Sequence, residues 1–355
     1  MAQSLAKPRY AYLDFLRIFA AFLVIVNHTN SLVFKALTPA SVDWWLSIAW
    51  YYVSKVAVPL FVMVSGACLL PRQDTYRQAF WRFLRVLLAL VLFSYVYYLV
   101  QILQDSWSWG RALDIPYFLK SIWRGRITDS FWYLYFYLGM MVMLPILQRL
   151  ASAMQKRDLL YFMAWSFGVY AAWPLLTHYV PQAVLPQYFD VPLFAVFLGF
   201  FFAGHYVHTY AVRVSRLLCL LAILAALAAS VWLTYMEYGR VAAGTKYWFM
   251  DERTAPSIFV VVGALAAMLL TKASFARRPA SEAGVRRWAS VGGTTFGIYL
   301  LQDLLIAESR YRFFVPVSKA IDPLLTAFIW EVGVFAVAFA VAWLLKRIPL
   351  LHKLL

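Results

Sequence analysis

Three ionisable residues in one apolar stretch near the start of the chain have the spacing of a reactive site. Asp14, Arg17 and His28 lie within residues 11–34, which are otherwise mostly apolar. The eleven residues from Arg17 to His28 make three full helical turns plus about 20°, so both side chains share one face, about 16 Å apart along the axis. Ionisable groups at membrane depth are costly and usually mark a site or an internal pair.

Two interpretations of these residues remain open at this point. In the first, His28 takes a proton from a substrate, because histidine has an ordinary pKa of about 6.5 and exchanges protons near neutral pH. In the second, Asp14 and Arg17 form a structural pair at the cytoplasmic edge of the membrane, and His28 is a satisfied core histidine. Asp14 lies too far along the axis to orient His28, so a reactive His28 needs a partner from another helix. The candidates, which the sequence does not rank, are Tyr299, Asp303 and Glu331.

The composition is that of a protein that crosses a membrane many times. Of the 355 residues, 64% are hydrophobic and only 14% are charged, whereas about a quarter of the residues of a soluble domain are charged. Apolar runs of about twenty residues predict transmembrane helices. We expect an all-α, polytopic fold in one membrane-embedded domain over residues 1–355. Its ten predicted spans lie near residues 11–34, 48–70, 82–103, 130–147, 159–176, 189–208, 214–236, 254–271, 288–307 and 323–345.

The basic residues predict how these spans are oriented. With both termini in the cytoplasm, the inner segments carry 19 of the 32 lysines and arginines and only three acidic residues, whereas the outer segments are nearly neutral. Positive charge is typical of cytoplasmic segments. The net charge of +16 therefore reflects topology, and we expect the bilayer and not a nucleic acid as its partner. Cys68 and Cys219 lie in apolar runs, and no set of residues has metal-ligand spacing, so we expect neither a disulfide nor a metal site.

A group of arginines at the start of the third predicted span could bind phosphate. Arg82 and Arg85 are three residues apart, and Arg77 precedes them by about one and a half turns. Arginine binds phosphate through two parallel hydrogen bonds, so several arginines at the start of one helix suit a polyphosphate. The alternative interpretation is that each arginine only marks the inner side of the membrane.

Two further segments have distinctive composition. The second predicted span contains Pro59 and the small residues Ser65 and Gly66, which predict a kinked helix with close backbone approach near its cytoplasmic end. Small residues here serve helix packing more often than chemistry. The outer loop 104–129 predicts a short interfacial helix, whose tryptophans either join the aromatic belt of the membrane or stack on sugar rings.

Five motifs occur in an order that resembles the membrane-bound acyltransferase-3 family, over essentially the whole chain. They are Asp14-x-x-Arg17-x10-His28, Val58-Pro59-Leu60-Phe61 with Ser65-Gly66, Arg82-x-x-Arg85, Phe131-Trp132-Tyr133-Leu134 with Pro145, and Thr295-Phe296-Gly297-Ile298-Tyr299. The chain resembles in particular the bacterial O-acetyltransferases of surface polysaccharides. Two positions depart from the family pattern: Trp81 replaces a basic residue, and Gln302 replaces a histidine that many members carry. The second departure disfavours a scheme that needs two histidines.

The resemblance implies an O-acyltransferase in the bacterial inner membrane. The donor would be cytoplasmic acetyl-CoA or another short acyl-CoA, and the acceptor a hydroxyl of a glycan or lipid-linked saccharide. The enzyme would act as a homo-oligomer or within a polysaccharide-assembly complex. His28 would serve as a base or as a transient acyl carrier. The resemblance implies catalytic roles for His28, Arg17 and Asp14, donor binding by Arg82, Arg85, Arg77, Ser65 and Gly66, and substrate binding by Trp132, Tyr133, Tyr299, Gln302 and Asp303. The alternative functions are a transporter or flippase of a glycan or lipid, since buried charges also line transport pathways, and a structural subunit of an assembly complex.

Overall fold

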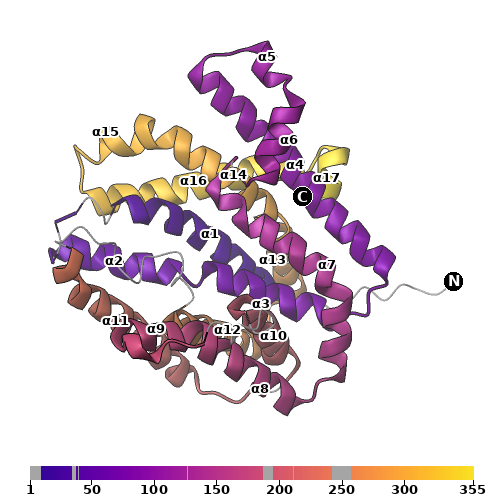
Figure 1. Cartoon of the computed structure of the whole chain (residues 1–355), viewed down its shortest axis with the longest axis vertical. Coiled ribbons are helices and arrows are strands. Elements are labelled where there is room, and N and C mark those ends of the chain that lie inside the picture. The colour runs from indigo at the N-terminus through magenta and orange to yellow at the C-terminus, as the bar shows by residue number, and fades with distance from the viewer. Residues whose placement is uncertain are drawn as a thin grey trace.

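Helix α1 (Ala11–Val33) runs through the middle of the molecule (Figure 1). The computed structural model describes residues 9–33, 37–38, 40–125, 127–186, 195–210, 212–241 and 257–355. Every regular element within these ranges is a helix. Helix α1 contacts α2, α3, α12, α13, α14 and α16. Leu16, Ala20, Leu23, Ile25 and Val26 of α1 are at most 1% exposed, as expected of a helix surrounded by other helices.

The remaining helices follow in chain order. Their bounds are α2 Val42–Ser54, α3 Ala57–Leu69, α4 Tyr76–Asp105, α5 Trp109–Ala112, α6 Ile115–Trp123, the 3₁₀ turn η2 Asp129–Phe131, α7 Trp132–Ala153, α8 Lys156–Phe167, the π segment η3 Gly168–Ala172, α9 Trp173–Tyr179, the 3₁₀ turn η4 Pro181–Ala183, α10 Val196–Thr209, α11 Arg216–Val241, α12 Ile258–Arg277, α13 Glu282–Gly292, α14 Thr295–Ser309, the π segment η9 Arg310–Phe314, α15 Val315–Val317, α16 Pro323–Leu345 and α17 Pro349–Leu354.

Eight helical stretches in the described part of the chain are long and apolar enough to cross a bilayer. They are Ala11–Asn30, Val42–Leu69, Tyr76–Asp105, Asp129–Ala153, Lys156–Tyr179, Arg216–Glu237, Ile258–Arg277 and Pro323–Leu345. The prediction of an all-α, multi-pass membrane protein is confirmed. The two other predicted spans correspond to α10 and α14, which have 14 and 15 residues. Residues 189–194 of the sixth predicted span and 254–256 of the eighth lie outside the described residues. The ten-span count and the cytoplasmic termini stay predictions.

The second and ninth predicted spans are each divided into two helices. The second begins six residues earlier than predicted, at Val42, where Ser41 caps α2 by accepting from the N–H of Trp44. It breaks at Lys55 and Val56, so the kink predicted from Pro59 is a full break just before it. Pro59 then falls in the first turn of α3, where a missing N–H costs nothing.

The ninth predicted span, 288–307, begins inside α13 and continues through α14. Gly293 and Thr294 form a turn between the two helices. The N-terminal part of this span is therefore a separate helix, α13, that packs against α1. The break leaves the carbonyl groups at the end of α13 in need of hydrogen-bond donors.

The close backbone approach predicted near the end of the second span is present between α3 and α10. A Cβ added to Gly66 would lie 1.8 Å from the carbonyl oxygen of Phe201, and one added to Gly204 would lie 1.8 Å from that of Met63. The two glycines thus let the two backbones touch, as small residues do between membrane helices. Gly66 is accounted for by this packing.

Helix α4 begins six residues before the predicted start of the third span. Thr75 and Gln78 form a reciprocal capping box that extends the helix to Tyr76. Arg82 and Arg85 therefore lie in the second and third turns of α4, and not at its start. Beyond the C-terminal end of α4, α5 and α6 project from the bundle (Figure 1). They supply the short helix predicted in loop 104–129, with Phe118 buried and Trp123 89% exposed.

The contact between α3 and α10 gives a direct stability test. Gly66→Ala and Gly204→Ala should each lower the thermal unfolding temperature of the purified protein in detergent, because the new methyl group overlaps a backbone carbonyl. Overpacking of this kind costs about 1–3 kcal/mol or more. Gly139→Ala in α7 is the matched control, because an added Cβ there meets nothing within 4 Å. Equal stability of all three variants would contradict the described crossing.

Candidate active site

A cavity of about 350 Å³ lies between α1, α3, α4, α7 and α14, next to the turn that joins α13 to α14. Side chains from segments far apart in the sequence line it. The polar and charged ones are Arg17, Ser65, Arg82, Arg85, Tyr133, Tyr137, Thr295 and Tyr299, and the largest apolar ones include Phe61, Met141 and Phe296. The structure thus brings together six of the residues singled out from the sequence: Arg17, Ser65, Arg82, Arg85, Tyr133 and Tyr299.

Asp14 holds Arg17 at this cavity. The carboxylate of Asp14 is only 2% exposed and pairs with two arginines, with 2.9 Å from Oδ2 to Nε of Arg9 and 3.3 Å from Oδ1 to Nη1 of Arg17. Nη2 of Arg17 lies 3.2 Å from Sγ of Cys68 on α3. A buried carboxylate needs such partners, and they fix the direction of the Arg17 side chain.

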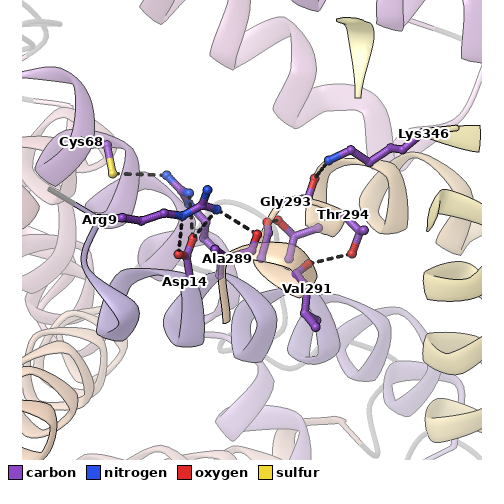
Figure 2. A network of polar contacts seen from close by, with 11 residues as sticks. Arg9, Asp14, Cys68, Ala289, Val291, Gly293, Thr294 and Lys346 are labelled. Carbon is purple, nitrogen blue, oxygen red and sulfur yellow. Dashed lines mark hydrogen bonds and ion pairs between the residues drawn. The ribbon is translucent and has the colours of Figure 1, made fainter. Parts of the chain in front are cut away.

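The same network joins α1 to the break between α13 and α14 (Figure 2). Arg9 also donates to the carbonyl oxygen of Ala289, at 2.8 Å, and Lys346 donates to that of Gly293, at 2.8 Å. These cations satisfy carbonyl groups at the end of α13, where the helix dipole favours positive charge. A Cβ on Gly292 would lie 2.9 Å from Oδ1 of Asp14, so only glycine lets α13 come this close.

Arg82 is held by an acidic residue that the sequence analysis did not single out. Its Nε and Nη2 atoms donate to the two carboxylate oxygens of Asp74, at 3.0 and 3.3 Å. Gln148 of α7 donates to the same carboxylate and accepts from the backbone N–H of Asp74. Burial alone would raise the pKa of Asp74, but the hydrogen bonds from Gln148 and Arg82 and the charges of Arg82 and Arg72 outweigh it and lower that pKa.

Arg85 has no carboxylate within ion-pair distance among the described residues. Its Nε atom donates to the carbonyl oxygen of Leu354, at 3.0 Å, and the adjacent Leu355 lines the cavity. Of the three cavity arginines, Arg17 and Arg82 therefore have acidic partners and Arg85 contributes an uncompensated charge. The cavity presents net positive charge to an anion.

Three other residues named from the sequence lie away from the cavity lining. Arg77 is exposed in the first turns of α4. Gly66 faces α10, as described above. Trp132 is 46% exposed, and its ring contacts Tyr133 and Phe197.

His28 is paired with Asp303, one of the three candidate partners. The distance from Nδ1 of His28 to Oδ1 of Asp303 is 3.8 Å, and the two side chains are 28% and 25% exposed. Asp303 accepts hydrogen bonds from the hydroxyl groups of Thr128 and Ser130, the latter at 3.1 Å. These two residues precede α7 and were not singled out from the sequence, although a polar triplet, Thr128-Asp129-Ser130, just before an apolar span is a usable signal.

The other two candidate partners are engaged elsewhere. Glu331 is fully buried and accepts from Oγ1 of Thr29, at 2.9 Å, and from Nε1 of Trp50, at 3.0 Å. Tyr299 donates to the carbonyl oxygen of Ser130. Tyr299 lines the cavity, and Asp303 lies one turn further along α14, so a single helix joins the cavity to the His28–Asp303 pair.

This arrangement is a cationic cavity at one end and a histidine–carboxylate pair at the other, inside a multi-pass helical membrane protein. The arginines suit an anion, and a histidine beside a carboxylate suits proton exchange. The family model for an acyltransferase domain matches residues 10–347. The chain therefore belongs to the acyltransferase-3 family, as its motifs predicted. A search of curated proteins found no match, and a search of solved structures found none either.

Asp74 provides a test of the pairing that holds Arg82 at the cavity. Asp74→Asn should lower the free energy of unfolding at pH 7 by about 1–3 kcal/mol, because it leaves Arg82 without its charged partner. The pKa of Asp74 is lowered in the folded protein, so its contribution is complete above the ordinary carboxyl value of about 3.9 and is lost as the pH falls through the lowered value. In detergent, the unfolding temperature of Asp74→Asn should thus be lower than that of the wild type from pH 7 to about pH 4, and the difference should shrink below pH 4. A difference that disappears between pH 7 and pH 5 would contradict the lowered pKa of Asp74.

Proposed function

We propose that this protein is an acyl-CoA-dependent O-acyltransferase. It moves an acetyl or other short acyl group from cytoplasmic acyl-CoA to a hydroxyl of a glycan or a lipid-linked saccharide. The observation that carries the proposal is the cavity in which Arg17, Arg82 and Arg85 meet, one helical turn of α14 away from a histidine–aspartate pair. Membership of the acyltransferase-3 family supports the reaction class.

The inner end of the site suits the phosphates of coenzyme A. Arginine is the residue best matched to phosphate, because its planar donors form two parallel bonds. Arg85, which has no acidic partner among the described residues, would meet the phosphates together with Arg82 and Arg17. Ser65, Tyr133 and Tyr299 line the path along which the pantetheine arm would lie. The axial separation of Arg17 and His28, about 16 Å, is comparable to the length of that extended arm.

The outer end of the site suits proton removal from an alcohol. An alcohol is a weak nucleophile until a base takes its proton. His28 takes the proton as the acceptor oxygen attacks the thioester carbonyl carbon, so a C–O bond forms. The C–S bond then breaks, and the coenzyme A thiolate leaves with the proton that His28 returns.

Asp303 is a positioning residue in this scheme. Its carboxylate faces Nδ1 of His28 at 3.8 Å, which leaves Nε2 for the acceptor hydroxyl and stabilises the imidazolium that forms. This distance is longer than a hydrogen bond, and such contacts often tighten when substrate binds. Thr128 and Ser130 hold the carboxylate in place.

The acceptor would arrive from the outer side of a bacterial inner membrane. Trp109, Tyr117 and Trp123 on the projecting helices α5 and α6 are 58–89% exposed and offer flat surfaces to sugar rings or to lipid headgroups. Tyr135 donates to the carbonyl oxygen of Ile122, at 2.6 Å, which ties α6 to the start of α7. A homo-oligomer or a polysaccharide-assembly complex would place such an acceptor near this face.

His28→Gln is the sharpest test of the reaction. Glutamine keeps much of the shape of histidine and some hydrogen bonding, but it cannot accept a proton at neutral pH. We expect acyl transfer to fall by about 10²–10⁴-fold, while acyl-CoA affinity measured by calorimetry is retained, because the arginines are about three turns away. Asp303→Asn should reduce kcat less than His28→Gln does and should change the pH–rate profile. Near-normal turnover of a well-folded His28→Gln protein would refute the proposal. If the wild-type protein becomes covalently acylated when acyl-CoA is supplied without acceptor, the reaction proceeds through an acyl-histidine.

Arg85→Ala tests the donor site with little effect on folding, because its only hydrogen bond in the described structure is to a carbonyl group at the surface. Loss of a charged hydrogen-bond set to phosphate is worth on the order of 1.5–3 kcal/mol, so the KM for acyl-CoA should rise roughly tenfold or more. Arg286→Ala is the matched control on the same inner face, because Arg286 is 73% exposed and, among the described residues, forms an ion pair only with Glu282. If both variants keep the wild-type KM, Arg85 only marks the inner side of the membrane.

A further inference from the structure

Gln302 on α14 is a buried amide without a hydrogen-bond partner. Its side chain is 0% exposed, and neither Oε1 nor Nε2 has a partner among the described residues. A buried, unpaired polar group loses its bonds to water and gains none in exchange, which costs stability. The cost is greatest in the interior of a membrane protein, where water is scarce. Such a group in a native structure calls for a physical reason.

The place of Gln302 in the helix suggests that reason. Tyr299, three residues earlier, lines the cavity, and Asp303, the next residue, pairs with His28. At 100° and 1.5 Å per residue, Gln302 lies about 60° around the helix from Tyr299 and about 4.5 Å beyond it. Gln302 is also only one residue, or about 1.5 Å along the axis, before Asp303, so the amide lies at the depth of the His28–Asp303 pair, where the proposed reaction brings the thioester.

We propose that Nε2 of Gln302 donates a hydrogen bond to the carbonyl oxygen of the acyl thioester and stabilises the oxyanion that forms on it. This inference rests on the proposed acyl transfer. As the acceptor oxygen bonds to the carbonyl carbon, the C=O electron pair moves onto oxygen, and a donor already aimed there lowers the barrier. When the C–S bond breaks, the pair returns to the carbonyl and the hydrogen bond weakens. The amide would thus find its partner only when substrate is bound.

This role predicts opposite effects on stability and on turnover. A structural amide forms bonds in the folded protein, so its removal lowers stability. An amide that waits for substrate has no bond to lose, so an apolar side chain of similar shape should leave stability unchanged or raise it. The same change should remove the stabilisation of the oxyanion.

The experiment compares Gln302→Met and Gln302→Leu with the wild-type protein in detergent, using acetyl-CoA and its acceptor. We expect kcat to fall by about 10²–10³-fold in both variants, with the KM for acetyl-CoA close to wild type and an unfolding temperature equal or higher. Ser166→Ala on α8 is the matched control. Ser166 is also 0% exposed, and its hydroxyl has no partner in the described part of the chain. It faces Gly199 of α10, so its removal should leave kcat unchanged.

Two results would overturn the assignment. Either variant with wild-type kcat would show that Gln302 does not act on the substrate, and a lowered unfolding temperature with a parallel loss of folded protein would make it structural. The wild-type measurement separates this inference from the proposed function. Wild-type protein without acyl transfer rejects the function itself, whereas active wild type with active Gln302→Met rejects only the role of Gln302.

Discussion

A carboxylate buried in a helical membrane bundle must be paired, and Asp14 meets this requirement with Arg9 and Arg17. The pairing does more than neutralise a charge. Arg9 reaches across to the carbonyl oxygen of Ala289 on α13, and Asp14 itself packs against Gly292. These contacts fix how α1 lies against α13 and the start of α14. Helices α1 and α14 then meet again nearer their C-terminal ends, where His28 faces Asp303.

Four acidic side chains organise the polar groups of the bundle. Asp14 and Asp74 orient Arg17 and Arg82 at the cavity, while Asp303 faces His28 one turn beyond the cavity residue Tyr299. Glu331, held by Thr29 and Trp50, ties α16 to α1 and α2 next to His28. Since only Arg85 of the cavity arginines has no carboxylate partner among the described residues, the cavity is cationic without being strongly repulsive. Such a cavity can be stable without a bound anion.

Much of this site was predictable, because the spacing of residues within a helical motif determines which side chains share a face. The stripe of Arg17 and His28 follows from helical periodicity, and the tenth predicted span, 323–345, matches α16 at both ends. Asp303 was among three candidate partners, but ranking them needed the packing of α14 and α16 around α1, which no local pattern encodes. Asp74 was missed because it lies in a short loop, and its role depends on Gln148 from α7.

The breaks in the second and ninth spans could not be predicted, for a different reason. Hydropathy averages over about twenty residues, so it cannot detect the turn at Gly293 and Thr294 or the end of α2 at Lys55. Gly66 shows the limit of motif reasoning: the family motif implied a place at the donor, whereas the backbone of Phe201 lies where its side chain would be. Ser65, its neighbour, does line the cavity. Adjacent residues of one motif can therefore serve packing and binding separately, because successive helix positions point about 100° apart.

In the proposed function, donor and acceptor reach one histidine from opposite sides of the membrane. Sealed membrane vesicles test it directly, because acetyl-CoA does not cross a bilayer unaided. Inverted vesicles that contain the protein, supplied with external acetyl-CoA, should acylate an acceptor enclosed in their lumen, and right-side-out vesicles given the same external donor should not. Acylation of an acceptor on the same side as the donor, or equal activity in both vesicle orientations, would contradict the account.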